Sequence, residues 1–235
     1  MGWRESGVTT ILAGTLLLAL IYAYLYRQHK RSFLGLWALA WISSTVHYSF
    51  RLAIDIVGLS SPLYFVCQMM SLTTSMCILW GAFVFAGKSS HRGWLVVVHV
   101  VVLWMGIMVF SESAAWLMIP VSLFVGYAYV RAGIVFLGLR DIGGPAPVIT
   151  GISFMLVGVM KAGEPLHPEL SWLDTWNYRV AAILGVFMAV GMLLVYFEKM
   201  RSEAAEGELR YRLLAENARD VIFRCRVFPS MKIEY

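Results

Sequence analysis

The chain has 235 residues, of which 60% are hydrophobic and 14% are charged, and its formal net charge is +5. A soluble domain of this size is roughly half apolar and about a quarter charged, so this composition excludes an ordinary soluble fold. Lys and Arg stand in short clusters between apolar runs, a placement that is typical of membrane topology and argues against a nucleic-acid partner.

Seven apolar runs have about the length of roughly 20 residues that a membrane-spanning helix needs. They cover residues 8–26, 33–53, 62–86, 94–110, 114–139, 146–162 and 176–197. The runs are continuous rather than alternating, which favours helices over a closed barrel as the way to satisfy backbone groups in lipid. The sequence therefore predicts an all-α membrane fold, a seven-transmembrane helix bundle that forms one domain over residues 1–197.

The basic residues of the short connections predict the orientation of the bundle. Lys and Arg lie in the first, third and fifth connections, at 27–31, 88–92 and 140, and again after the seventh run. Cytoplasmic loops carry the excess of Lys and Arg, so these connections are expected inside the cell. The N-terminus is then outside and the C-terminus cytoplasmic, in agreement with an odd number of spans.

Ionisable residues within the second run are the strongest candidates for a site, because such groups are costly inside a membrane. His47, Arg51 and Asp55 follow each other four residues apart and share one helix face. We hypothesise a ligand site, open to the outside, between the second and third runs. Its residues are His47, Arg51, Asp55, Gln68 and Ser71. The alternative is that these residues are polar contacts that hold the two helices together.

Two further groups of polar residues have structural alternatives. His99 in the fourth run and Arg131 in the fifth are placed for a hydrogen-bonded contact, which is either a signal relay or a contact that specifies the bundle. A third group lies around the last long connection: Lys161, Glu164, His167, Glu169, Asp174 and Arg179. One His among flexible carboxylates is poor evidence for a metal, so we interpret this group as a solvated loop and expect no metal site.

After residue 197 the composition changes from apolar to charged. Residues 198–208 predict a solvated helical connector, with Gly207 as its expected end. The pattern Leu-Leu-x-Glu-Asn-x-x-Asp, from Leu213 to Asp220, lies in a segment that resembles the opening of a PAS domain. The resemblance implies a strand at 221–227, a turn at 228–230 and a second strand at 231–235. Residues 209–235 would be the incomplete start of an α+β PAS domain, and we expect the chain to be the N-terminal part of a longer protein.

The apolar part resembles the seven-transmembrane input regions that precede PAS domains in bacterial sensor histidine kinases and diguanylate cyclases. The residues that carry this resemblance are Leu36-Trp37-Ala38-Leu39-Ala40-Trp41 and the following His47-Tyr48. It implies a sensor in the bacterial cytoplasmic (inner) membrane that relays an extracytoplasmic or membrane signal through its seventh helix to a PAS domain. The implied output is a histidine kinase of a two-component system, with a diguanylate cyclase as the first alternative. A small-solute transporter or binding protein is the alternative from another class.

The chain itself carries no recognisable catalytic motif, since Walker loops, Cys-x-x-Cys pairs and nucleophile elbows do not occur in it. Enzymatic activity is therefore expected only from a downstream domain. We expect no cofactor in this chain and leave open whether the PAS portion binds one. The expected partners are the lipid bilayer, a small-molecule or membrane-borne ligand and, from the resemblance, a second copy in a homodimer.

Overall fold

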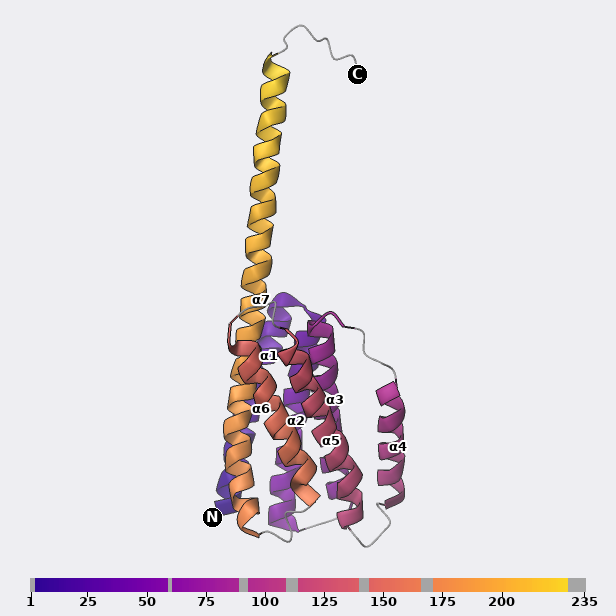
Figure 1. The fold of residues 1–235 in the computed structure, drawn as a ribbon. Helices are drawn as coiled ribbons and strands as arrows, with labels where there is room; N and C mark the ends of the chain where they lie inside the picture. Colours follow the sequence, from indigo (N-terminus) through magenta and orange to yellow (C-terminus); the bar gives the residue numbers. More distant parts are fainter. Residues whose placement is uncertain are drawn as a thin grey trace. The chain divides into compact units, whose positions relative to one another are not determined.

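The computed structural model describes residues 3–58, 61–88, 93–108, 114–139, 144–165 and 171–227 (Figure 1). These residues are almost entirely helical, and no strand occurs among them. The helices are α1 (Trp3–His29), α2 (Ser32–Val57), α3 (Ser61–Phe85), α4 (Gly93–Met108), α5 (Ala114–Leu137), α6 (Ala146–Gly163) and α7 (Ser171–Val227). The expected all-helical architecture of the apolar part is thus confirmed.

Five of the described helices contain a segment that is long and apolar enough to cross a membrane. These segments are Gly7–His29, Pro62–Phe85, Ile119–Leu137, Ala146–Gly163 and Arg179–Asn217. They make the chain a multi-pass helical membrane protein. The 16 residues of α4 span about 24 Å, less than the roughly 30 Å of a hydrocarbon core. Helix α2 is long enough, but its polar residues lower its mean hydropathy. Membrane crossing by α2 and α4 therefore stays a prediction.

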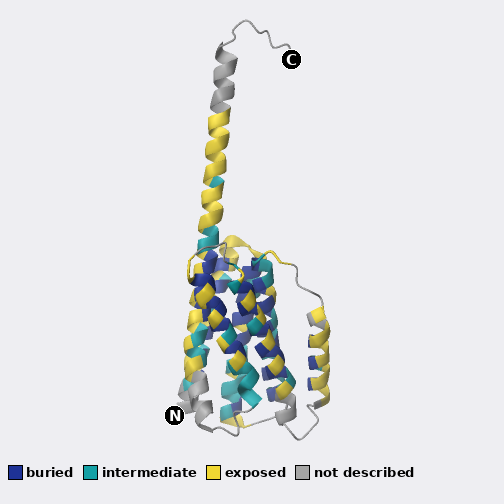
Figure 2. Cartoon of the chain, viewed as in Figure 1, coloured by how far each residue is buried: buried dark blue, intermediate teal, exposed yellow. Residues whose placement is uncertain are grey.

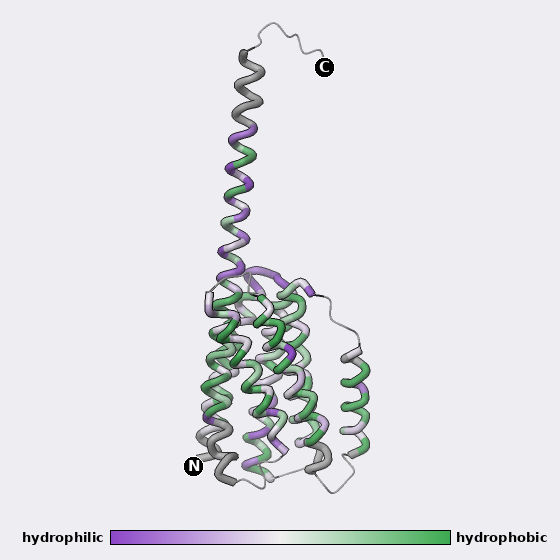
Figure 3. Tube along the Cα trace, in the orientation of Figure 1, coloured by the Kyte–Doolittle hydropathy of each residue, from purple (hydrophilic) through white to green (hydrophobic). Residues whose placement is uncertain are grey.

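The chain divides into two compact units, Met1–Met192 and Leu193–Tyr235, and each is described by itself. In the first unit α1 packs against α2, α2 against α3, and α5 against α6, as short connections between sequence neighbours favour. Helix α3 also packs against α5, and α4 contacts α5. Figure 3 shows these helices as mostly hydrophobic and the connection between α1 and α2 as hydrophilic.

Aromatic side chains around Trp37 of α2 fill the interior of the first unit. Trp37 is fully buried. Its ring centroid lies 5.2–6.1 Å from four others, those of Tyr22, Phe33, Phe85 and Phe136. The pairs with Tyr22 and Phe33 are edge-to-face, a geometry that aromatic rings prefer. This aromatic core ties α1, α2, α3 and α5 together, and Figure 2 shows the inward faces of these helices as buried.

Helices α5 and α6 approach each other so closely that glycine is required at the contact. A Cβ atom at Gly126 would lie 2.7 Å from the carbonyl oxygen of Gly158, and one at Gly133 would lie 2.6 Å from that of Gly151. Real Cβ atoms do not come this near to a backbone oxygen. Small residues allow such backbone contact between membrane helices, where packing replaces the hydrophobic effect as the driving force. We call these four residues the α5–α6 glycine contact.

In the second unit the helix differs from the expectation. Residues 221–227, expected to form a strand, belong to α7, and the helix also passes through Gly207, which was expected to end it. A strand needs a partner for its backbone groups, and the described residues contain no strand to pair with. The preceding residues 198–216 are rich in Ala, Glu, Arg and Leu, which are good helix formers, and α7 continues from them through 221–227, although the Val, Ile and Phe residues of this segment favour a strand. The second expected strand, 231–235, lies outside the described residues.

Candidate functional site

His47 of α2 is anchored to α3 through its imidazole ring. The Nδ1 atom lies 2.8 Å from the backbone carbonyl oxygen of Cys67, and the Cys67 Sγ lies 3.3 Å from the same nitrogen. The carbonyl can only accept, so Nδ1 donates, and Nε2 is then the acceptor nitrogen of the neutral ring. His47 is half-buried and Cys67 fully buried. One nitrogen of His47 is therefore committed to joining the two helices, and only Nε2 can serve a ligand.

Hydroxyl groups continue this polar seam between α2 and α3. The Ser43 Oγ donates to the Met70 carbonyl oxygen at 3.4 Å, and the Thr74 Oγ1 lies 3.4 Å from the Ala40 carbonyl oxygen. Of the two predicted site residues on α3, Gln68 is buried and Ser71 is half-buried. Such interhelical hydrogen bonds contribute about 0.6 kcal/mol each in membrane proteins. Part of the predicted site thus serves helix association.

Two residues assigned to a solvated loop contribute to this region instead. Lys161, near the end of α6, forms an ion pair with Glu164, and their side chains are only 18% and 26% exposed. Both are close enough to His47 to act on it electrostatically, and so is Arg51. Arg51 and Asp55 are half-buried, and both act on Cys67. The structure thus brings the charged residues of α2 and α6 to one end of the first unit.

Two tyrosines complete the group, since both Tyr48 of α2 and Tyr129 of α5 interact electrostatically with Lys161. The side chains of this site come from four helices, and we call them the α2–α6 polar cluster. Its members are His47, Tyr48, Arg51, Cys67, Tyr129, Lys161 and Glu164. Cations and phenols supply donors, and Glu164 with the Nε2 of His47 supplies acceptors. The cluster therefore contains both donors and acceptors of hydrogen bonds.

Glu164 lies just beyond the membrane segment of α6, and its ionisation is set by Lys161. Burial alone would raise the pKa of Glu164, but the charge and hydrogen bond of the Lys161 ammonium group, together with His47 and Arg51, outweigh burial and hold the pKa below its ordinary value. Glu164 is therefore a carboxylate at neutral pH, and the ion pair persists. A charged pair with little exposure places a strong dipole beside the imidazole of His47.

The sequence did hold a signal that Lys161 and Glu164 lie near the predicted site, namely the number of spans between them and α2. In an alternating bundle, the end of the second helix, the start of the third and the end of the sixth lie on one side. The remaining loop candidates add nothing here: His167 and Glu169 lie outside the described residues, as does the side chain of Asp174, and Arg179 is exposed. Among the residues that the structure describes, no three His, Cys, Asp or Glu side chains gather into a metal site.

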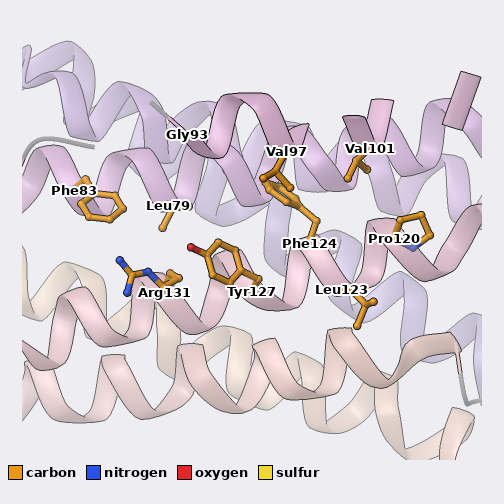
Figure 4. A pocket seen from close by; sticks show the side chains of 10 residues that line it. All are labelled: Leu79, Phe83, Gly93, Val97, Val101, Pro120, Leu123, Phe124, Tyr127 and Arg131. Atoms are coloured by element: carbon orange, nitrogen blue, oxygen red, sulfur yellow. The ribbon is translucent and has the colours of Figure 1, made fainter. Parts of the chain in front are cut away.

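The other predicted pair falls near a separate cavity. Arg131 lines a cavity of about 580 Å³ between α3, α4 and α5 (Figure 4). His99 is exposed on α4. The cavity residues are Leu79, Phe83, Gly93, Val97, Val101, Pro120, Leu123, Phe124, Tyr127 and Arg131. A relay between His99 and Arg131 stays a prediction.

The arrangement was compared with protein families, with characterised proteins and with solved structures. None of the three comparisons gave a match. The function of the chain therefore has to be argued from its own residues: a polar cluster where four apolar helices meet, and a long seventh helix.

Proposed function

We propose that the chain is the membrane-embedded input module of a bacterial signal-transduction protein. It senses an extracytoplasmic or membrane signal at the α2–α6 polar cluster and relays it through α7 to a PAS domain and a downstream histidine kinase. A diguanylate cyclase is the alternative output. One observation carries the proposal: α7 is helical from Ser171 to Val227, so apolar and charged connector residues belong to one helix with no interruption at Gly207. An unbroken helix can transmit a rotation or a shift.

The proposal includes seven membrane crossings, with the N-terminus outside and the C-terminus cytoplasmic. The clusters of Lys and Arg in alternate connections support it. An impermeant thiol reagent applied to intact cells should label Gly2→Cys and Val57→Cys, and should label Glu216→Cys only after lysis. Protection of Val57→Cys in intact cells would show that α2 does not cross. Labelling of Gly2→Cys and Glu216→Cys from the same side would contradict the whole topology.

The ligand shifts the module only if it binds two helix arrangements with different affinity. The polar cluster offers such a difference, because it joins side chains from α2, α3, α5 and α6 whose mutual distances depend on packing. A ligand that takes the Nε2 of His47 and competes with Glu164 for Lys161 would rearrange the ends of these helices.

The homodimer is supported by the spacing of residues in the second unit. Met200, Ala204, Gly207, Tyr211 and Leu214 recur at alternating intervals of four and three, the repeat of a coiled-coil seam. Tyr211 and Leu214 are 78% and 66% exposed in the single chain, so a partner helix would cover them. The small residues Ala204 and Gly207 make the seam weak, which suits a helix pair that must change its packing.

Disulfide cross-linking tests the input module and its dimer together. With Cys225 replaced by Ser, single cysteines at 204, 206, 211 and 213 are introduced into the membrane-bound protein and oxidised. Cross-linking should be strong at 204 and 211 and weak at 206 and 213. Arg51→Gln should change this pattern, whereas Arg27→Gln, which removes an exposed charge outside the cluster, should not. Equal cross-linking at all four positions would contradict the dimer, and a pattern unaffected by Arg51→Gln would contradict the relay.

A further inference from the structure

The cavity between α3, α4 and α5 has a chemistry that the polar cluster does not share. Its volume is about 580 Å³, in the range of binding sites for small molecules, and its walls are apolar apart from one end. Arg131 is the one charged residue among those that line it. A cation at one end of an apolar cavity selects ligands that have an acidic head and an apolar remainder.

The polar end is built from two residues on one face of α5. Arg131 follows Tyr127 by one helical turn, and Figure 4 shows the tyrosine hydroxyl pointing toward the Arg131 end of the cavity. At the start of α4, Gly93 lines the same cavity, and a Cβ there would meet nothing within 4 Å. This end therefore has space for a head group, a guanidinium to pair with it and a hydroxyl to donate to it.

The apolar remainder of the cavity follows α5 toward Pro120. From Arg131 to Pro120 the helix rises roughly 16 Å, a length suited to an extended acyl chain. Val97 and Val101 of α4 form the opposite wall. Leu123 and Val97 are each about half exposed, so the cavity can be reached from the lipid side of these helices.

We propose that this cavity binds an acidic amphiphile, whose phosphate or carboxylate pairs with Arg131 and whose acyl chain lies along α5 toward Pro120. The hydroxyl of Tyr127 donates a second hydrogen bond to the acidic group. A zwitterionic lipid also carries an ammonium group, for which the cavity residues offer no carboxylate, so acidic lipids are preferred. Basic pockets between membrane helices bind acidic head groups in this way. The inference is independent of the signalling role, because it concerns a separate cavity.

Native mass spectrometry of the purified chain, released from mixed micelles, tests the site. Phosphatidylglycerol, phosphatidylethanolamine and palmitate are offered in turn, and inorganic phosphate serves as the head-group probe without a chain. We expect phosphatidylglycerol to be retained over phosphatidylethanolamine. Arg131→Gln should lower that preference about fivefold, the usual effect of one basic residue near lipid phosphate, and Arg131→Lys should largely preserve it. Palmitate retention without phosphatidylglycerol retention would identify a fatty acid as the occupant. Preferential retention of phosphatidylglycerol and retention of palmitate alone both support the proposal.

Two controls separate the site from general lipid binding. Arg27→Gln removes an exposed charge of α1 that does not line the cavity and should leave the preference unchanged. Val97→Trp fills the cavity and should abolish retention with Arg131 intact. Far-UV circular dichroism confirms that each variant is folded. The proposal is overturned if the unaltered chain retains both phospholipids equally, or if Arg27→Gln lowers the phosphatidylglycerol preference as much as Arg131→Gln does. It is also overturned if inorganic phosphate alone is retained to the same extent as the lipids.

Discussion

The α5–α6 glycine contact allows a sharp test of the packing, through Gly158→Ala. A methyl group at Gly158 would lie 2.8 Å from the Gly126 carbonyl oxygen and 3.0 Å from the Val130 backbone nitrogen. Ordinary contact begins at 3.4 Å, so the helices would have to separate by about 0.6 Å, the difference between 3.4 and 2.8 Å. Adding a methyl group to a tightly packed interface costs about 1–3 kcal/mol. Alanine also favours the helix over glycine by about 1 kcal/mol, which would hide part of that cost.

The matched control is Gly14→Ala in α1, where a Cβ meets nothing within 4 Å. The helix-propensity gain is common to both variants, so the difference between them isolates the clash. We expect Gly158→Ala to be less stable than Gly14→Ala by about 1–3 kcal/mol, the cost of overpacking. The difference in stability is measured by unfolding both variants in detergent micelles with sodium dodecyl sulfate. Far-UV circular dichroism follows the loss of helix during the titration. Equal unfolding midpoints for the two variants would refute the close contact.

Three more predictions concern the core and the polar cluster. Trp37→Ala should destabilise the chain by about 3–5 kcal/mol in the same titration, because it empties the centre of the aromatic core. His47→Ala should cost only about 0.6–1.7 kcal/mol, since it removes one interhelical hydrogen bond to the Cys67 carbonyl and a weak contact with the Cys67 sulfur, and a larger loss would mean that the ring does more than join the helices. The depressed pKa of Glu164 means that the unfolded chain binds a proton more readily than the folded one. The contribution of Glu164 to the stability of the fold is complete above the unfolded pKa of about 4.3, and it is lost as the pH falls through the lower folded pKa. Thermal midpoints measured from pH 7 to pH 3 should therefore fall less in Glu164→Gln, and identical falls would show that the Lys161 pair contributes nothing.

Much of the fold could be predicted from the sequence because lipid leaves the backbone few options. Continuous apolar runs mark helices whatever their neighbours, and each of the seven runs overlaps a described helix over most of its length. The ends of the helices, above all the end of α7, were harder to predict. The strand at 221–227 was expected from a family pattern. The Val, Ile and Phe residues of this segment also favour a strand, but the described residues hold no strand to pair with, and the segment continues helix α7.

The candidate site was only half predictable, for a geometrical reason. Spacing along one helix identified the face that carries His47 and Arg51, and the short connection to α3 identified its neighbour. Lys161 and Glu164 are more than 100 residues away in sequence, and no periodicity relates them to α2. Their half-burial depends on the packing of α6 in the bundle, which composition alone does not give.

The environment of Trp37 has a consequence for spectroscopy. Trp37 is fully enclosed by protein, whereas Trp80 and Trp104 are 47% and 38% exposed as residues, on helix faces that lipid can reach. Acrylamide in water and brominated acyl chains in the bilayer should therefore both fail to quench Trp37, while the bromolipids quench Trp80 and Trp104. The protected fraction of the emission then reports the integrity of the bundle interior, and the quenched fraction reports its lipid-facing side, without any added dye.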